Sequence, residues 1–194
     1  VYTIRAIRKD YGRRPADLDV PAGSCVGLWI WGVPGCGKSR WVRHYHDRED
    51  LYDKQLNKWW DGYVAERFVL LDDFDRNHSV LGSHLKRWAD RYAFPAEWKG
   101  GKTDIRPQRV IVTSNLEPDS IWCDEKDREI LYALLRRFTV VQFVQGAFYS
   151  IDAVGNPVRV NYNPYDSDME STGDVNEQAD ERDEVMVPPS WLEE

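Results

Sequence analysis

The stretch Gly32–Ser39, with the sequence GVPGCGKS, constrains this chain more than any other feature. It fits the pattern G-x-x-x-x-G-K-[ST], follows the apolar run Val26–Trp31 and precedes a predicted helix over Ser39–His46. In that strand–loop–helix context, small residues let several backbone N–H groups point at a polyphosphate. Lys38 is expected to reach the β- and γ-phosphates, and the Ser39 hydroxyl to bind Mg²⁺. We expect ATP to be bound by the whole loop: Gly32, Val33, Pro34, Gly35, Cys36, Gly37, Lys38 and Ser39.

Short apolar strands alternate with helices after this loop. Buried strands are predicted at Phe68–Leu71, Val110–Val112 and Phe138–Phe143, and helices over about Leu81–Tyr92 and Asp124–Leu135. Strands of three to six apolar residues between helices are typical of a parallel sheet that is covered on both faces. The sequence therefore predicts an α/β fold of the P-loop NTPase type, with a parallel central sheet flanked by helices.

Charge divides the chain into a body and a tail. The whole sequence has 26 basic and 33 acidic residues, a formal net charge of −7. From Ile151 onward there are 12 acids and two bases, so the tail carries −10 and the body +3. We expect the body, but not the tail, to meet nucleic acid. The predicted division is a basic linker or subunit-contact segment with weak helical character over 1–24, an ATPase domain over 25–145, a candidate hairpin extension over 146–162 and a disordered acidic tail over 163–194.

Several classes of protein fit this sequence poorly. No apolar run approaches the length of a membrane-spanning helix, so we expect a soluble protein without a membrane partner. Cys25, Cys36 and Cys123 have no metal-type spacing, and their odd number favours a reducing compartment. The segment His44–His46 resembles the metal motif of nicking enzymes, but no Tyr-x-x-Lys nucleophile motif accompanies it, and we interpret it as coincidence. Because the sequence begins with Val1, we expect a piece of a longer protein.

Two strand ends carry the polar groups that ATP hydrolysis needs besides a phosphate cradle. Asp72 and Asp73 directly follow the second strand, and Asn115 follows the third. Asp72 is expected to hold Mg²⁺ through water, and Asp73 to orient or deprotonate the attacking water. The neutral amide of Asn115 suits a contact with the γ-phosphate or the water. Without a catalytic role, Asp72 and Asp73 would form an acidic surface turn, and Asn115 would cap the end of its strand.

Two basic features each allow two interpretations. Arg136 and Arg137 end a helix, where one of them can act as a finger on a neighbouring subunit's ATP, or both can simply offset the helix dipole. Lys99 and Lys102 flank two glycines in a predicted turn. That turn is either a hairpin tip that contacts nucleic-acid phosphates without reading bases, or an ordinary exposed turn. The sequence does not choose between Arg136 and Arg137.

Together, these segments resemble the helicase part of the replication initiator (Rep) of circular single-stranded DNA viruses, the circovirus-like group. The correspondence covers about Tyr2–Phe143. It assigns Gly32–Ser39 to Walker A, Phe68–Asp73 to Walker B, Lys99–Lys102 to the B-prime region and Val110–Asn115 to motif C, and Asn57–Tyr63 and Trp88–Phe94 are also typical of the group. The ordered set is far more specific than Walker A alone.

The resemblance implies a superfamily 3 helicase with an AAA+-like fold, which assembles as a ring, commonly a hexamer, and acts in the host cell nucleus. ATP and Mg²⁺ would bind between subunits, at Lys38, Ser39, Asp72, Asp73 and Asn115, with an arginine finger donated in trans. Lys99 or Lys102 would contact single-stranded DNA, or RNA, since similar domains occur in small RNA viruses. The nicking endonuclease domain of the family is not expected within this stretch.

Two other functions remain open from the sequence. A P-loop kinase of nucleosides or small metabolites would explain Gly32–Ser39, but it gives Asn115 and the lysine-flanked turn no task. An ATP-gated assembly module would use the same nucleotide site to control ring formation without unwinding.

Overall fold

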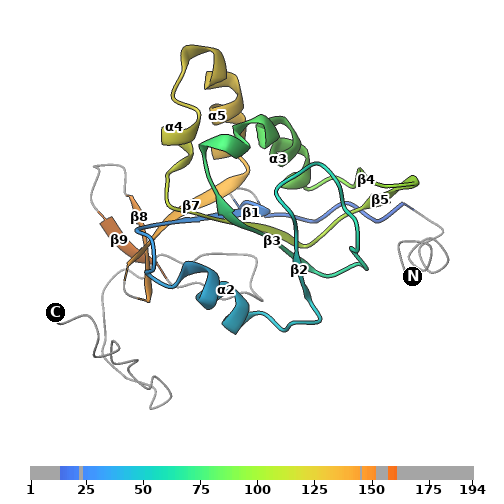
Figure 1. Cartoon of the computed structure of the whole chain (residues 1–194), viewed down its shortest axis with the longest axis horizontal. Helices are drawn as coiled ribbons and strands as arrows, with labels where there is room; N and C mark the ends of the chain where they lie inside the picture. The colour runs from blue at the N-terminus through green and yellow to red at the C-terminus, as the bar shows by residue number, and fades with distance from the viewer. Residues whose placement is uncertain (1–13, 22–23, 145, 152–156, 161–194) are drawn as a thin grey trace.

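A seven-stranded sheet with the strand order β2-β3-β6-β1-β7-β8-β9 forms the centre of the molecule (Figure 1). The computed structural model describes residues 14–21, 24–144, 146–151 and 157–160. The strands are β1 (Gly27–Trp31), β2 (Leu51–Asp53), β3 (Phe68–Phe74), β4 (Phe94–Trp98), β5 (Gly101–Ile105), β6 (Arg109–Ser114), β7 (Phe138–Val144), β8 (Ala147–Ile151) and β9 (Pro157–Val160). Strands β2, β3, β6, β1 and β7 run parallel, and β8 and β9 add to β7 as antiparallel strands. The predicted α/β fold with a mostly parallel sheet is confirmed.

Helices cover both faces of this sheet (Figure 1). They are α2 (Lys38–Tyr45), the 3-10 helix η1 (Arg76–Leu81), α3 (Gly82–Trp88), α4 (Pro118–Ile121), the 3-10 helix η2 (Glu125–Asp127) and α5 (Arg128–Leu135). Alternate residues of each central strand enter two separate cores. Trp29 packs with residues of α3, α4 and α5, whereas Leu28 and Ile30 pack with Val42 of α2. Burial on both faces is why the strand sequences read as continuous apolar runs.

The predicted helix over Leu81–Tyr92 is wrong in its bounds. Helical structure starts earlier, at η1, because the Asp75 carboxylate accepts a hydrogen bond from the backbone N–H of Asn77 and caps the first turn. It ends at Trp88 in α3, and Tyr92 lies exposed in the following bend. The helix predicted from Asp124 likewise begins as η2 and becomes α-helical only from Arg128.

Other predicted segments differ from the structure or fall outside it. Residues 14–20 form neither helix nor strand, and Arg14 and Leu18 instead donate hydrogen bonds to backbone carbonyls of the segment Arg91–Ala93. Pro15 has no N–H for a helix interior, which is consistent with this path. Residues 1–13 and the acidic tail over 163–194 lie outside the described part of the chain. Strand β2 was not predicted, whereas the antiparallel pair β8–β9 matches the expected hairpin.

The carboxyl ends of β1, β3 and β6 meet at one edge of the sheet, because these strands are parallel neighbours. The loop Gly32–Gly37 leaves β1 there, and Asp72, Asp73 and Asn115 lie at the ends of β3 and β6. Among the described residues, none of the helices has the length and apolar character that crossing a bilayer requires. The fold therefore gathers the predicted nucleotide-binding residues at the edge where parallel sheets bind ligands.

Candidate functional site

The loop Gly32–Gly37 packs closely against strand β7. A Cβ at Gly32 would lie 2.5 Å from the backbone oxygen of Phe143, so only glycine allows the loop to leave β1 along this path. Gly37 is the N-cap of α2 and has a φ of 98°, a conformation that L side chains rarely adopt. The glycines thus turn the chain so that the N-terminus of an eight-residue helix faces the loop, which is the arrangement that binds phosphate.

Lys38 joins the loop to the end of strand β6. Its side chain is only 7% exposed, and its Nζ donates hydrogen bonds to the backbone oxygens of Gly32 (2.9 Å) and Val33 (3.0 Å). The same Nζ donates to Asn115 Oδ1 at 3.0 Å. Two predicted site residues 77 positions apart are therefore in direct contact.

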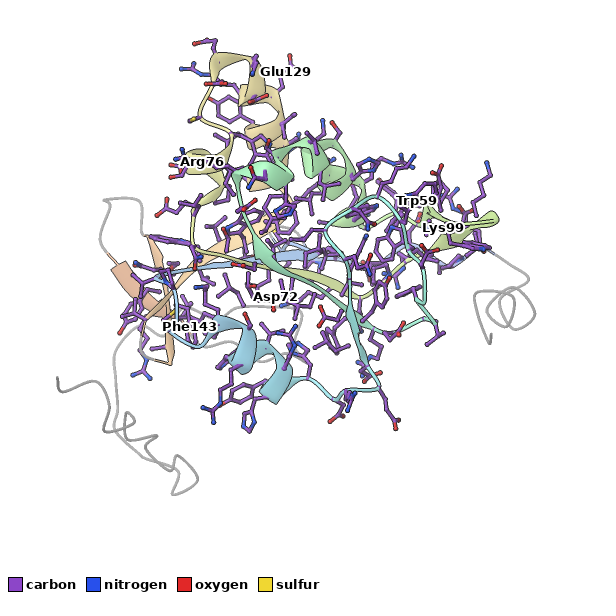
Figure 2. The ribbon with its side chains drawn as sticks, in the orientation of Figure 1. Trp59, Asp72, Arg76, Lys99, Glu129 and Phe143 are labelled. Carbon is purple, nitrogen blue, oxygen red and sulfur yellow. The ribbon has the colours of Figure 1, made fainter. Side chains whose placement is uncertain are left out.

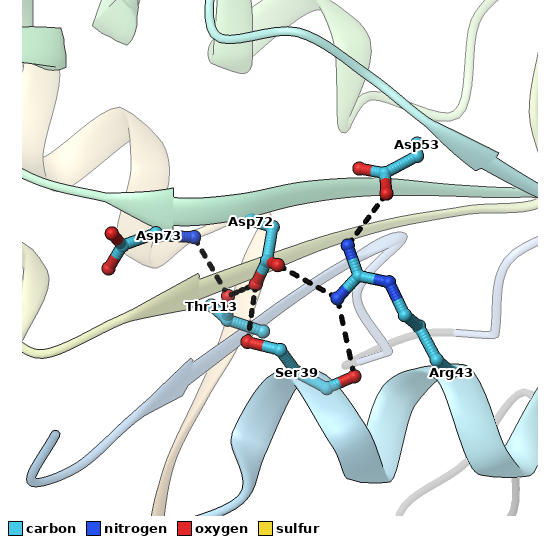
Figure 3. A network of polar contacts seen from close by, with 6 residues as sticks. All are labelled: Ser39, Arg43, Asp53, Asp72, Asp73 and Thr113. Carbon is cyan, nitrogen blue, oxygen red and sulfur yellow. Dashed lines mark hydrogen bonds and ion pairs between the residues drawn. The ribbon is translucent and has the colours of Figure 1, made fainter. Parts of the chain in front are cut away.

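A second polar network surrounds Asp72 (Figure 3). Its Oδ1 accepts hydrogen bonds from Ser39 Oγ at 2.6 Å and Thr113 Oγ1 at 2.5 Å. Its Oδ2 accepts from Arg43 Nη1 at 2.8 Å, and the other arm of this arginine reaches Asp53 Oδ2 at 2.6 Å. Burial acts to raise the pKa of Asp72, but the hydrogen bonds from Ser39, Thr113 and Arg43 outweigh it and hold that pKa below 3.8.

The chemistry of Ser39 and Asp72 fits Mg²⁺. The hydroxyl and the ionised carboxylate are hard oxygen ligands, and they lie within hydrogen-bond distance of each other. Mg²⁺ in phosphate sites is held by one or two protein oxygens, with substrate phosphates and waters completing its shell. In the described part of the chain, no group of three or more His, Cys, Asp or Glu side chains could hold a metal by itself. This pair therefore suits a metal that arrives with a polyphosphate.

Asp73 points away from this network (Figure 3). Its φ of 57° coincides with a break in register between β3 and β6, and its backbone N–H donates to Thr113 Oγ1 at 3.0 Å. The irregularity turns the Asp73 side chain outward, where it is exposed, while Asp72 faces Ser39. The two neighbouring acids thus lie in different environments, one hydrogen-bonded and the other open to solvent.

The two candidate arginines lie at the other end of the parallel strands, near their amino termini. Arg136 and Arg137 precede β7, whose first residue, Phe138, pairs with Gly27 at the start of β1. The length of β1, about 15 Å, separates them from the phosphate loop. Arg137 binds Asp90 through Nε and Nη2, both at 2.8 Å, whereas the Arg136 side chain is exposed. Neither arginine is brought to this subunit's own loop.

Lys99 and Lys102 occupy different positions on the β4–β5 hairpin, and Figure 2 labels Lys99 at its end. Lys99 and Gly100 form the turn, and Gly100 has a φ of 108°. Lys102 lies in β5, directly opposite Glu97 in β4. The predicted lysine-flanked turn is therefore the tip of a β-hairpin, with Lys99 in the turn and Lys102 on its side.

Arg43 and Asp53 were not identified from the sequence. Arg43 has no motif of its own, and Asp53 ends the short strand β2, which lacks a clear pattern. The one available signal was the position of Arg43, four residues after Ser39 and so on the same face of the helix. His44 is exposed and His46 is buried against Val42 O, so this pair does not converge on a metal.

Known proteins match the part of the chain that contains these residues. The family described as RNA helicase matches residues 28–116, which contain the phosphate loop, both acids, the hairpin and Asn115. The replication-associated protein of Porcine circovirus 1 is 36% identical over 147 residues, covering 69% of this chain and 46% of that protein. Its counterpart in Porcine circovirus 2 is 39% identical over 119 residues, or 61% of this chain and 37% of the relative. These matches identify a helicase domain of the type found in the Rep proteins of circular single-stranded DNA viruses.

A third Rep relative comes from Beak and feather disease virus, with 38% identity over 113 residues, 58% of this chain and 36% of that protein. The chain thus spans less than half the length of these Rep relatives. The family match ends at residue 116, so Arg136 and Arg137 lie beyond the segment that it covers.

Proposed function

We propose that this chain is the ATP-driven motor of a viral replication initiator, and that it moves along single-stranded DNA and unwinds duplex. The observation that carries this proposal is the convergence of Lys38, Asn115 and the Ser39–Asp72 pair at one edge of the sheet. A phosphate-binding lysine, a neutral amide and a metal-binding pair in one place are among the parts that ATP hydrolysis requires.

Each group has a distinct task at the phosphates. Lys38 exchanges the oxygens of Gly32 and Val33 for those of the β- and γ-phosphates. Ser39 and Asp72 hold Mg²⁺, which when bound offsets the charge of the phosphates. Asn115, already within 3.0 Å of Lys38 Nζ, lies where an amide meets the γ-phosphate or the attacking water. Asp73, whose side chain is exposed outside the Asp72 network, orients or deprotonates that water.

A second copy of the chain completes the site. The two arginines before β7 lie a strand length from their own phosphate loop, so a finger must reach the loop of a neighbour. Arg136 is the better candidate, because Arg137 already forms an ion pair with Asp90. We take the assembly to be a ring, commonly a hexamer in this family, with Lys99 and Lys102 contacting single-stranded DNA in its channel.

The proposal is tested by steady-state ATP hydrolysis with and without oligo(dT). Wild-type protein should hydrolyse ATP with Mg²⁺ and be stimulated by the oligonucleotide, and Lys38→Ala should lose at least a hundredfold in rate, since its ammonium contacts the transferring phosphate. Arg40→Ala is the matched control, because Arg40 lies exposed on the same helix and should leave the rate unchanged.

Other outcomes of the same assay identify the alternatives. Phosphate transfer to a nucleoside acceptor without any DNA effect would replace the motor with a kinase. ATP-dependent assembly without hydrolysis or strand separation would replace it with an assembly module.

A further inference from the structure

Trp59 differs from the other tryptophans of the described residues. Seven belong to or pack against the two apolar cores: Trp29, Trp31, Trp41, Trp60, Trp88, Trp98 and Trp122. Trp59 is in neither core, although its neighbour Trp60 is fully buried. Its large ring is half-buried in a loop on the surface. Tryptophan is enriched at binding interfaces, where its ring supplies a large contact area, so Trp59 is a candidate for contact with a partner.

The loop that carries Trp59 is held rigidly from inside. Lys54 is only 1% exposed, and its Nζ donates hydrogen bonds to the backbone oxygens of Gln55, Asn57 and Trp59, the last at 2.8 Å. The same Nζ lies 4.9 Å and 4.6 Å from the ring centroids of Trp60 and Trp88. The backbone N–H of Trp59 also donates to Asn57 Oδ1 at 2.8 Å. Trp59 is therefore presented on a fixed backbone, which reduces the entropy lost on binding.

This loop is joined to the lysine-tipped hairpin (Figure 2). The backbone N–H of Trp60 donates to Glu97 O at 2.8 Å, and the N–H of Lys99 donates to Asp61 Oδ1 at 3.0 Å. These two bonds hold the two residues that follow Trp59 against strand β4 and the start of the hairpin turn. The Trp59 ring and the hairpin tip thus share one face of the molecule.

The charge of this face suits an anionic partner. Lys58 Nζ lies 4.4 Å from the centroid of the Trp59 ring, and Lys99 is at the adjoining tip. The acid Asp61 accepts the Lys99 N–H, and Glu97 lies opposite Lys102 in the β4–β5 pair. On the neighbouring helix α3, burial lowers the pKa of His84, the positive charges of Arg87, Lys54 and Lys58 lower it further, and the charge of Glu97 opposes them.

We infer that Lys58 and Trp59 form a nucleotide subsite beside the hairpin, in which a base of single-stranded nucleic acid stacks on the Trp59 ring while Lys58 and Lys99 contact the flanking phosphates. Aromatic rings interleaved with lysines are how proteins bind single strands without reading their sequence. The inference rests on the proposed function, because it gives the proposed DNA-binding hairpin a stacking partner. The lysines that border the Trp59 ring favour a nucleic acid over a second copy of this chain as the partner, because nucleic acid is anionic.

The test measures binding of oligo(dT) by fluorescence anisotropy at fixed salt, with and without abasic sites in the oligonucleotide. Trp59→Ala should weaken binding of intact oligo(dT) about tenfold, within the range known for base stacking, while Trp59→Phe should keep most of it. On the abasic oligonucleotide the wild type and Trp59→Ala should bind equally, because no base is left to stack. Lys58→Ala should instead lower the salt dependence of binding, by a slope of about 0.7.

The outcomes separate this inference from the proposed function. If wild-type protein does not bind oligo(dT), the proposed function fails. If Lys99→Ala weakens binding but Trp59→Ala binds intact oligo(dT) like the wild type, the function stands and the Trp59 subsite is wrong. An equal loss on intact and abasic oligonucleotides, or a loss of assembly size in Trp59→Ala, would also overturn the subsite, the latter in favour of a protein interface. A far-UV circular dichroism spectrum and a urea-unfolding midpoint like those of the wild type show that the variant is folded.

Discussion

Asp72 shows how one residue of the motif depends on a partner that belongs to no motif. Its carboxylate accepts hydrogen bonds from α2 and from β6, and Arg43 bridges it to Asp53 at the end of β2. Two carboxylates beside a polyphosphate would repel it, and the single guanidinium between them offsets that charge. Arg43 therefore positions Asp72 and offsets the negative charge of the two carboxylates, although it belongs to none of the motifs recognised in the sequence.

The effect of Arg43 on stability should depend on pH. Because the pKa of Asp72 in the folded protein lies below 3.8, its ordinary value, its interactions stabilise the fold above about pH 3.8 and are lost as pH falls through the folded pKa. Arg43→Ala should lower the free energy of unfolding by about 1 kcal/mol at pH 7, a modest amount because the arginine is 42% exposed. Urea unfolding followed from pH 7 to pH 3 measures this difference, which should shrink at the acidic end.

The control for this prediction is Arg40→Ala, on the same helix but exposed, which should show no pH-dependent loss. A difference between Arg43→Ala and wild type that stays constant down to pH 3 would mean that packing of the arginine, and not its charge, stabilises the site.

At the scale of elements, the sequence predicted what the longer apolar runs dictate. Strands β1, β3, β6 and β7 lie where their runs are, and parallel pairing brings Lys38 to Asn115. Strand β2 was missed because three residues with one exposed aspartate carry no periodic signal. The contacts of Arg43 were missed for the same reason, since they depend on where an edge strand lies in space. Trp59 and Trp60 differ in burial, which only the structure shows, because two adjacent identical residues look alike in the sequence.

The loop from Lys54 to Tyr63 is hydrogen-bonded to the β4–β5 hairpin, and Lys54 holds this loop in place from the interior. Lys54→Met keeps the length of the side chain but leaves three backbone oxygens without their donor. The free energy of unfolding should fall by about 3 kcal/mol, and hydrogen exchange at the Lys99 N–H should become faster. Chemical denaturation and amide exchange measure the two effects. Lys58→Met, on the exposed side of the same loop, should change neither.

The pH dependence gives this prediction a second readout. Burial lowers the pKa of Lys54 to about 7, against 10.5 for an ordinary lysine, while the charge of Asp61 opposes the shift. Between these two values the unfolded chain holds more protons than the folded one, so this residue makes stability rise with pH across that window. The rise should be absent in Lys54→Met. A wild-type protein whose stability does not rise between pH 7 and pH 10 would show that Lys54 stays charged in the fold.

At the scale of the whole molecule, the parallel strands give the subunit two chemically different ends. The phosphate loop leaves the carboxyl ends of the strands, and Arg136 and Arg137 lie at the amino end of β7. A subunit with its nucleotide site at one edge and its exposed arginine at the other matches a head-to-tail contact, which closes into a ring when the rotation between copies allows it. The sequence could not distinguish Arg136 from Arg137 as the proposed arginine finger. The distinction depends on which arginine is already paired with Asp90 in the fold.

Mixed assemblies test the contribution of each arginine. Arg137→Ala removes the ion pair with Asp90 and should lower the free energy of unfolding by about 1–2 kcal/mol. Arg136→Ala should leave stability unchanged and abolish ATP hydrolysis. Mixing Arg136→Ala with Lys38→Ala in equal amounts should restore activity, because about a quarter of the interfaces in a random ring then join an intact lysine to an intact arginine. Neither variant alone regains it. If the mixture stays inactive while assembly size is unchanged, Arg136 does not complete the site of its neighbour.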